Sequence, residues 1–282
     1  MKDKTRGRGG RQERPVQRSQ ERTKFEAPRR MGERPAEKPG HIYGALPVLE
    51  ALRGNARRLE RILVADGARE HRLNQVFELA RDAGVRIERV SRESLVRIVG
   101  PDVNHQGVVA FASAAEYVSL DDILSDTPGP ALIVLLDGVE EPRNLGAVLR
   151  TVECAGADGV IIPERRAVGL TDTVAKSSAG ATEHVKVAKA ANLNRVIDDL
   201  KQRNIWVVGT SGNAGMNYTE WDWKQPSALV LGAEGSGLHR LVSENCDVLV
   251  KIPMYGKIDS LNVSVAAGVI LFEAKRQRGE ER

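Results

Sequence analysis

The chain is poor in cysteine and in aromatic residues, and it has no long apolar run. Two cysteines, Cys154 and Cys246, stand among 282 residues, and aromatic residues make up 4%. Two cysteines cannot build the disulfide framework of a small secreted protein. We expect both to be small buried residues in a reducing cytoplasm, and we disfavour a disulfide between them. The longest apolar runs, such as 131–136 and 265–272, are too short to cross a bilayer.

The N-terminus shows no apolar core of the kind that marks a secretory signal. Together with the cysteine content, this pattern leads us to expect a cytoplasmic protein that is not associated with a membrane.

Metal-ligand spacing is also missing from the sequence. Five histidines are scattered along the chain without a cysteine pair beside them: His41, His71, His105, His184 and His239. Zinc sites need closely spaced cysteine and histidine ligands, so we expect no metal.

We expect His105 to be structural, although contact with RNA is the alternative. Packing is likewise favoured for Trp221 and Trp223, over stacking on a base.

Positive charge is concentrated at the N-terminal end. Residues 1–40 hold thirteen Lys/Arg against six Asp/Glu, a net charge of +7, which leaves −3 for the rest of a chain whose total is +4. Such a segment is attracted to polyphosphate without reading sequence. A solvated extension with no role is an equally supported interpretation, and a segment foreign to the natural chain is a third.

The first part of the chain divides into a polar tail and a small unit. Residues 1–39 are rich in Arg, Glu, Gln, Gly and Pro and cannot bury enough apolar surface to offset chain entropy, so we expect them to be disordered. Residues 40–114 alternate between helical and strand patterns. Helices are expected at 43–53, 71–83 and 91–99, the last capped by Ser91, and strands at 59–65, 85–90 and 108–112. These elements predict a small α/β domain.

The second part predicts a larger α/β domain after a polar linker. Residues 115–129 form the linker, with a short helix near 120–124, and residues 130–282 alternate between apolar strands and helices. Strands are expected at 131–136, 159–162, 185–187, 206–209, 228–231 and 248–252, and helices at 145–155, 193–203 and 260–277. This alternation predicts a parallel sheet with helices on both faces. Ligands of such sheets bind beyond the carboxyl ends of the strands.

One segment of interest is 137–150, with the sequence DGVEEPRNLGAVLR. Asn144 can cap the following helix, and its amide can also face a ligand. Helical spacing buries Leu145, Val148 and Leu149 and places Arg150 on the opposite face. An ordinary solvated arginine is the alternative interpretation.

A second segment, 231–238, reads LGAEGSGL and follows a predicted strand. Its glycines allow the backbone to approach a ligand closely, and Glu234 lies within the bend. The segment lacks the lysine of a phosphate-binding loop and the spacing of a dinucleotide fingerprint. A tight strand-to-helix turn is the alternative.

A third segment, 252–264, reads IPMYGKIDSLNVS and precedes the last predicted helix. Ser260 and Asn262 are placed at the start of that helix, where free backbone N–H groups point outward. The small residues Ser264, Ala266, Ala267 and Gly268 permit close helix packing. A capping serine before a tightly packed helix is the alternative interpretation.

The three segments together, in this order, resemble the three motifs of the SpoU (TrmH-type) 2′-O-ribose methyltransferases of the SPOUT class. The resemblance covers roughly residues 131–278 and shows no departure at the polar motif positions. The segments 41–44 and 104–110 resemble the L30e-like substrate domain of the RlmB-type 23S rRNA (guanosine-2′-O-)methyltransferases. Residues 1–39 lie outside the resemblance.

The resemblance implies a fold, a cofactor and a partner. It implies a trefoil knot in the C-terminal domain, a bent S-adenosylmethionine bound within it, an RNA substrate and a homodimer with the site near the interface. The positions that match the backbone grip on the cofactor, or lie near it, are Gly232, Ile252, Leu261, Thr210 and Met254. The positions that match the functional polar residues are Asn144, Arg150, Glu234, Ser260 and Asn262.

The chemistry requires alignment of oxygen, methyl and sulfur and stabilisation of charge on the oxygen, without a metal. The resemblance assigns Arg150 to activation of the hydroxyl, even as a base. Since a guanidinium is not normally deprotonated, we expect Arg150 instead to contact an RNA phosphate and favour the developing alkoxide. Ser260, Asn144 and Asn262 would orient the ribose, and Glu234 would position these groups or Arg150.

Three other functions stay open. A transfer-RNA ribose methyltransferase would use the same motifs, and only the L30e-like unit favours ribosomal RNA, by analogy. A non-catalytic RNA-binding or ribosome-assembly protein would not need the five polar motif residues together. A nucleotide-binding α/β protein that uses 232–237 for phosphate is disfavoured by the missing lysine.

Overall fold

The computed structural model describes residues 40–54, 59–68, 73–101, 103–113 and 116–279. The expected disorder of residues 1–39 and the start of the helix expected at 71–83 lie outside the described residues.

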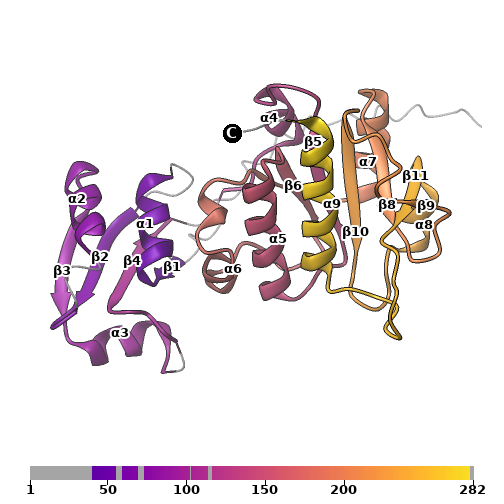
Figure 1. Ribbon diagram of the computed structural model, residues 1–282. Helices are drawn as coiled ribbons and strands as arrows, with labels where there is room; N and C mark the ends of the chain where they lie inside the picture. The colour runs from indigo at the N-terminus through magenta and orange to yellow at the C-terminus, as the bar shows by residue number, and fades with distance from the viewer. Residues whose placement is uncertain (1–39, 55–58, 69–72, 102, 114–115, 280–282) are drawn as a thin grey trace, which may run out of the picture. The chain divides into compact units, whose positions relative to one another are not determined.

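A four-stranded sheet forms the first part, with the strand order β1-β4-β2-β3 (Figure 1). Strands β2 and β3 are parallel, and β4 runs antiparallel to β1 and β2. The strands are β1 (Gly40–Tyr43), β2 (Leu59–Ala65), β3 (Arg86–Val90) and β4 (Val108–Ala112). The helices are α1 (Ala45–Arg53), α2 (Asn74–Asp82) and α3 (Arg92–Val99).

The predictions for this part are right for β2 and β4, whose bounds are those expected, and wrong for the start of the first helix, which was expected at Tyr43. The sequence GHIY of residues 40–43 forms the edge strand β1, and α1 begins at Ala45. Four residues with one buried side chain are too few to show an alternating pattern, and pairing with β4 decides their conformation. Ser91 caps α3 as expected, because its side chain accepts from the backbone N–H of Ser94 at 3.3 Å.

A seven-stranded, wholly parallel sheet forms the second part, with the order β7-β6-β5-β10-β8-β11-β9. Its strands are β5 (Leu132–Asp137), β6 (Gly159–Pro163), β7 (Val187–Ala190), β8 (Trp206–Thr210), β9 (Met216–Asn217), β10 (Ser227–Gly232) and β11 (Val248–Lys251). The helices are α4 (Leu120–Ser125), α5 (Pro142–Ala155), α6 (Asp172–Ser177), the 3-10 turn η2 (Ala181–Glu183), α7 (Leu193–Gln202), α8 (Arg240–Glu244) and α9 (Val263–Arg278). The predicted parallel sheet is confirmed.

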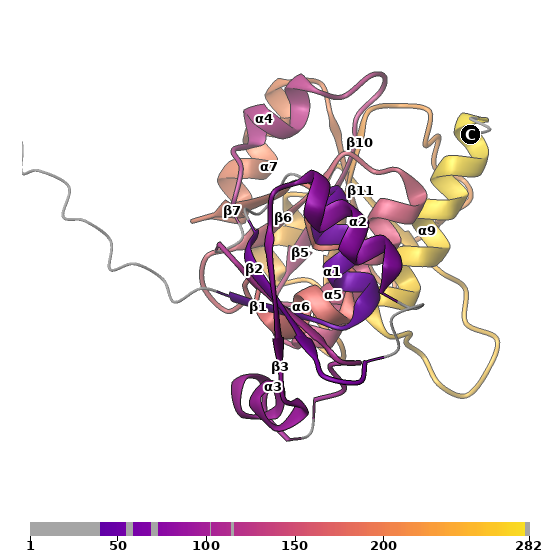
Figure 2. The ribbon, with the colours of Figure 1, turned by 90° about the vertical axis from the view of Figure 1, so that its left-hand side faces the viewer.

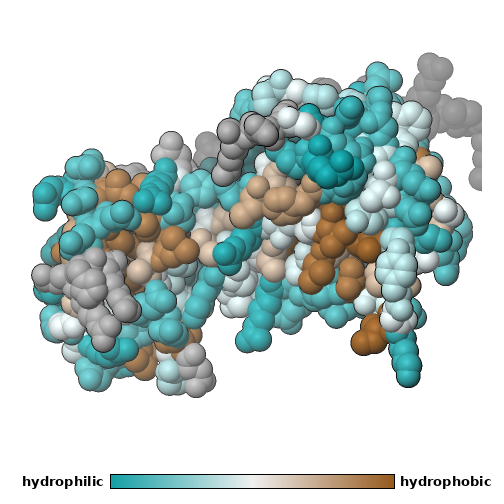
Figure 3. All heavy atoms as spheres, viewed as in Figure 1, coloured by the Kyte–Doolittle hydropathy of each residue, from teal (hydrophilic) through white to brown (hydrophobic). Residues whose placement is uncertain are grey.

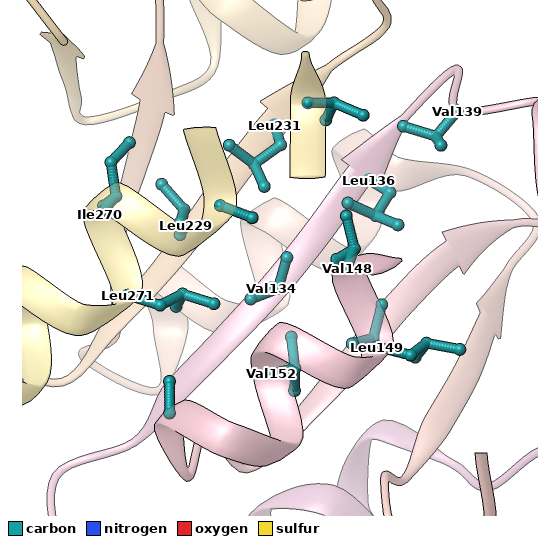
Figure 4. Packing of buried hydrophobic residues seen from close by; sticks show 14 of the residues in the cluster. Val134, Leu136, Val139, Val148, Leu149, Val152, Leu229, Leu231, Ile270 and Leu271 are labelled. Carbon is teal, nitrogen blue, oxygen red and sulfur yellow. The ribbon is translucent and has the colours of Figure 1, made fainter. Parts of the chain in front are cut away.

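Helices cover both faces of this sheet, as expected. Helices α5 and α9 lie side by side on one face, and α4 and α7 lie on the other (Figures 1 and 2). Alternate side chains of β5 point to opposite faces of the sheet. Val134 and Leu136 pack toward α5 and α9, whereas Ile133 and Leu135 pack toward the opposite layer. The first of these interfaces is a cluster of buried aliphatic side chains from β5, β10, α5 and α9 (Figure 4).

Several local expectations need correction. The polar stretch 171–182 contains α6 and η2, and the strand expected at 185–187 runs from Val187 to Ala190. All three of these elements are short, so local sequence patterns indicate them only weakly. Trp223 is fully buried and donates from Nε1 to the Tyr218 carbonyl at 2.8 Å, which confirms packing for this tryptophan.

The two cysteines differ from each other. Cys154 is exposed, so the expectation of a buried residue is wrong there. Cys246 is partly buried, and burial raises the pKa of its thiol to about 12. A thiol with this pKa is almost wholly protonated near neutral pH and therefore a poor nucleophile.

Within the described residues, no helix is long and apolar enough to span a membrane.

Candidate active site

Three cavities follow one another along the carboxyl edge of the parallel sheet. The β10 cavity, about 580 Å³, lies beyond the ends of β10, β8 and β11. The β5 cavity, about 560 Å³, lies between the segments that follow β5 and β10, and the β6 cavity, about 480 Å³, lies beyond β6 and β5. The order of the strands reverses here: β6 and β7 follow β5 on one side, whereas β10 is inserted between β5 and β8 on the other. Such switch points are where open α/β sheets bind ligands.

The β10 cavity contains all five positions that the sequence assigns to the cofactor. Gly232, Ile252, Leu261, Thr210 and Met254 line it together, although they come from three segments: the ends of β8 and β10 and the loop that follows β11. Their proximity follows from strand order, because β10, β8 and β11 are neighbours whose parallel direction brings their following loops to one edge.

A tight turn after β10 forms one wall of this cavity. Ala233 and Gly237 exchange two backbone hydrogen bonds, of 3.1 and 2.9 Å, and so close the turn. A Cβ on Gly232 would overlap the backbone of Gly237 and Leu238, so only glycine fits at this position. The backbone of Gly235 and Gly237 has positive φ, of 83° and 67°, which also favours glycine.

Asn144, Glu234 and Asn262 form one hydrogen-bonded cluster. The Asn262 Nδ2 group donates to Asn144 Oδ1 at 3.0 Å and to Glu234 Oε2 at 3.2 Å. Asn144 Nδ2 donates in turn to Glu234 Oε2 at 3.4 Å. Three of the five polar residues singled out in the sequence thus meet, at separations of up to 118 residues.

The start of α9 fixes the direction of these hydrogen bonds. Asn262 Oδ1 accepts from the backbone N–H of Ser264 at 3.0 Å and from its hydroxyl at 2.6 Å. With its oxygen held at the helix terminus, the Asn262 amide must turn its NH₂ group toward Asn144 and Glu234. The Asn144 oxygen then faces Asn262, which leaves the Asn144 NH₂ for Glu234. A helix cap therefore sets the polarity of the cluster.

The prediction that Asn144 caps a helix and the predicted helix start at Ser260 are both wrong. Asn144 does not cap α5, which begins earlier at Pro142, with Glu141 as the N-cap whose side chain accepts from Arg143 N–H at 3.3 Å. Ser260 does not start α9, because the helix begins at Val263 and Asn262 is its N-cap. Proline at the first helical position sets the true start of α5, since its fixed φ suits a helix and its missing N–H costs nothing there.

The other two predicted polar residues lie outside this cluster. Ser260 lines the β10 cavity from the loop before α9. Arg150 is exposed on α5, opposite buried Val148, Leu149 and Val152, as the helical spacing predicts. Arg150 lines none of the three cavities described here. Relative to Asn144 it is displaced by six residues, about 9 Å along the helix and about 240° around it.

Sequence reasoning missed a pair of residues beside the cluster, Asp137 and His239. Asp137 ends β5 with its side chain 6% exposed, and it accepts from the His239 backbone N–H at 2.7 Å and from the Nδ1 atom at 2.9 Å. The two residues are 102 positions apart, and no sequence motif predicts that they are in contact. The one available signal was the position of Asp137 at the carboxyl end of a buried strand.

The β10 cavity suits S-adenosylmethionine. Its volume falls in the range of small-molecule sites. Apolar side chains such as Val250, Ile252 and Leu261 offer surface for an adenine ring and methylene groups. The carboxylates of Glu234 and Asp259 suit a ligand that carries a sulfonium and an ammonium group. Among the described residues, no group of three or more His, Cys, Asp or Glu side chains is placed to hold a metal ion.

Comparison with known proteins supports the same interpretation. Residues 131–272 match the model of the SpoU rRNA Methylase family, and residues 41–118 match that of RNA 2′-O ribose methyltransferase substrate binding. A Bacillus subtilis protein, YacO, named as a TrmH family tRNA/rRNA methyltransferase, is 44% identical over 241 residues, 84% of this chain and 96% of its own. The 23S rRNA (guanosine-2′-O-)-methyltransferase RlmB of Ralstonia nicotianae is 46% identical over 238 residues, 84% and 95% of the two chains.

One of the similar solved structures contains the bound cofactor. The SpoU methyltransferase AviRb from Streptomyces viridochromogenes, in complex with AdoMet, matches with a TM-score of 0.72 and 26% identity, over 84% of this chain and 90% of its own. The cavities at the carboxyl edge of the parallel sheet, the cluster beside them and these matches agree: the chain belongs to the SpoU rRNA Methylase family and is an S-adenosylmethionine-dependent RNA 2′-O-methyltransferase.

Proposed function

We propose that this enzyme methylates the 2′-hydroxyl of a guanosine in 23S ribosomal RNA. The observation that carries the proposal is the 46% identity to the Ralstonia RlmB protein, which extends over 84% of this chain and so includes the first sheet. A transfer RNA is the second candidate substrate, because other relatives such as YacO are named as tRNA/rRNA methyltransferases.

The proposal divides the chain by function. Residues 40–114 would bind RNA and residues 130–282 would bind the cofactor and carry out the transfer, with 115–129 as the linker and 1–39 as a basic tail. The match of residues 41–118 to a substrate-binding family supports the first assignment. We also propose an L30e-like fold for the first part and a trefoil knot in the second, built from the loops around the β10 cavity.

The bound cofactor would supply a methyl group already activated by its sulfonium. Gly232, Ile252 and Leu261 would hold it by their backbone, with Thr210 and Met254 close by, in the β10 cavity. Glu234 also lines the β5 cavity, together with Asn144, so the two cavities adjoin at the cluster. A ribose in the β5 cavity would therefore lie next to the methyl donor.

The polar residues would align the ribose rather than take its proton. The cluster polarity fixes Asn144 and Glu234 before RNA arrives, so little reorganisation would accompany binding. Ser260, at the β10 cavity, would complete the ribose contacts. Arg150 would contact a phosphate and stabilise developing negative charge on the oxygen.

Arg150 would act in the site of a second copy. It lies about 9 Å along α5 from Asn144, on another side of the helix, and it lines none of the three cavities of its own chain, which supports this assignment. An exposed apolar surface for such pairing exists on α9, where Val265 and Phe272 are 50% and 52% exposed. Figure 3 shows hydrophobic side chains gathered over this helix. We therefore propose a homodimer with each site completed across the interface.

A methyl-transfer assay tests the substrate. Purified full-length protein and labelled S-adenosylmethionine would be incubated with unmodified 23S rRNA and, in parallel, with unmodified transfer RNA. We expect one 2′-O-methylated guanosine in the 23S rRNA. Label in transfer RNA alone would keep the chemistry and overturn the choice of substrate, whereas methylation of another nucleotide in 23S rRNA would overturn only the choice of guanosine.

A further inference from the structure

We infer that the β6 cavity is a phosphate site that holds the RNA strand next to the target nucleotide. Arg165, Arg166 and Arg240 line this cavity together with His239. The inference rests on the proposed function, since it names a contact that the RNA substrate makes outside the reaction centre.

The three cavities form a continuous track along the sheet edge. The β10 and β5 cavities share Glu234 and Ser236, and the β5 and β6 cavities share Arg166 and His239. Their order follows the strand order from β8 and β10 through β5 to β6. A strand whose target ribose lies in the β5 cavity beside the cofactor would therefore place a neighbouring nucleotide in the β6 cavity.

Charge distinguishes the β6 cavity from the other two. Three arginines line it, and its one lining carboxylate, Asp137, is buried and hydrogen-bonded to His239. The β5 cavity instead has three glutamates, Glu140, Glu141 and Glu234, against one arginine, the shared Arg166. A phosphodiester group would thus be repelled from the β5 cavity and attracted to the β6 cavity.

The arginine side chains are accessible to a ligand. Arg165 and Arg166 are exposed, in the loop that follows β6. Arg240 pairs with Glu244 at 2.7 Å, but the two side chains are 76% and 57% exposed. Solvent screens an ion pair this exposed, so a phosphate can compete for the guanidinium. Planar guanidinium groups bind phosphate oxygens in a bidentate manner.

His239 connects the two cavities in a fixed orientation. Because a carboxylate can only accept, Nδ1 must donate to Asp137 Oδ1, and the backbone N–H donates to the other oxygen. Gly138 leaves room for this ring, since a Cβ there would come within 3.3 Å of His239 Cε1. The imidazole is therefore a fixed polar group at the passage from ribose to phosphate.

The test uses Arg165→Gln and Arg240→Gln, singly and together, in the full-length protein. Lys224→Gln is the matched control, since it removes one exposed charge just before β10, at the amino edge of the sheet. Three quantities would be measured for each: cofactor affinity, the salt dependence of 23S rRNA binding, and kcat and KM for that RNA. Each arginine variant should raise KM about 5-fold and flatten the log–log salt slope by about 0.7–0.9. Cofactor affinity and kcat should not change.

The outcomes separate this inference from the proposed function. Arginine variants with the KM and salt slope of Lys224→Gln would overturn the phosphate site while leaving the methyltransferase assignment intact. Wild-type protein that binds 23S rRNA without methylating it would overturn the proposed substrate, and the salt slopes would still decide the phosphate site. A lower kcat at saturating RNA in the single variants would place these arginines in the reaction instead and also overturn the inference.

Discussion

At the scale of single residues, the geometry of the site depends on which atom of each side chain faces which partner. Asn262 shows this most clearly, since its oxygen caps α9 and its nitrogen holds both Asn144 and Glu234. An amide provides a donor and an acceptor on opposite atoms, and no charged side chain of the same shape does so. The residue therefore couples the start of a helix to the arrangement of the proposed ribose contacts.

Asn262→Asp tests this coupling. The new carboxylate would still accept from Ser264 N–H and cap α9. Its second oxygen, however, would replace the Nδ2 group that now lies 3.0 Å from Asn144 Oδ1 and 3.2 Å from Glu234 Oε2, and would face two acceptors. We expect turnover to fall roughly 100-fold, the scale seen when a preorganised donor is lost.

Ser264→Ala is the control for this prediction, because it removes only the hydroxyl that donates to Asn262 Oδ1. It should leave turnover within about 3-fold of the wild type and cost about 1 kcal/mol of stability, measured by urea unfolding. Near-normal turnover of Asn262→Asp would show that the cluster does not need the amide.

His105 is the residue for which pH dependence is expected. Its side chain is buried, 3% exposed, and its Nδ1 accepts from Gly107 N–H at 3.1 Å, so it is structural as expected. Burial, and secondarily the charge of Arg92, lowers the pKa of this imidazole. A lowered folded-state pKa means that the stabilisation is present above the unfolded pKa of about 6.5 and is lost as pH falls through the folded value.

His105→Asn should therefore flatten this part of the pH dependence, since the amide oxygen can accept from Gly107 in place of Nδ1 and does not titrate. The urea midpoint would be compared at pH 7.5 and 5.0. We expect the wild type to lose more stability than the variant over this interval, and equal losses would contradict the structural role of the neutral imidazole.

At the scale of elements, the turn after β10 decides whether a cofactor cavity exists. The turn packs so closely on the end of its own strand that Gly232 has no room for a side chain, and the obstructing atoms belong to the backbone of Gly237 and Leu238. Backbone atoms cannot rotate away as a flexible side chain can, so a substitution must displace the whole turn.

Gly232→Ala should accordingly weaken S-adenosylmethionine binding at least 10-fold and lower the melting temperature, by overpacking that costs about 1–3 kcal/mol. Gly215→Ala is the matched control, since a Cβ there meets nothing within 4 Å and its φ is not positive. Calorimetric titration with the cofactor and thermal unfolding would measure both effects. Equal cofactor affinity in the two variants would mean that the turn does not shape the site.

At the scale of the whole molecule, the question is whether one chain contains a complete site. Asn144 and Glu234 of the cluster line the β5 cavity, and Glu234 also lines the β10 cavity, whereas Arg150 lines none of the three. If the site is completed by a second copy, each chain of a dimer supplies Arg150 to the site of its partner, and two differently damaged chains can repair each other.

Complementation tests this arrangement. Arg150→Ala alone should abolish turnover and leave cofactor binding largely intact, because Arg150 lies away from the β10 cavity. Asn144→Ala alone should also be inactive. In an equal mixture, half of the dimers would be mixed, and one of their two sites would hold both native residues, which restores about a quarter of wild-type activity.

The mixture would be denatured, refolded together and assayed, with separately refolded samples combined afterwards as the control. No recovery, with dimers demonstrated by light scattering, would place Arg150 in the site of its own chain or outside it. A monomer that is fully active would overturn the shared site altogether.

The sequence by itself determined the class of the fold and most of its regular elements. The apolar runs of β2 and β4 and the apolar face of α5 are local patterns, because the periodicity of a strand or a helix is visible within a few consecutive residues. Resemblance to a family then added the roles expected of residues in the three motif segments. The four-residue strand β1 and the short helix α6 were missed because so few residues carry too weak a pattern.

Only the tertiary structure decided how the motif segments meet. Insertion of β10 between β5 and β8 brings Asn144 to Glu234, 90 residues away, and Asp137 to His239, 102 residues away. Neither contact can be predicted from the neighbouring sequence. The periodicity of side chains indicates the face of the sheet on which a residue lies, but not which strand pairs with its own. The meeting of the cluster residues and the arginine-lined cavity beyond β6 and β5 follow from that pairing.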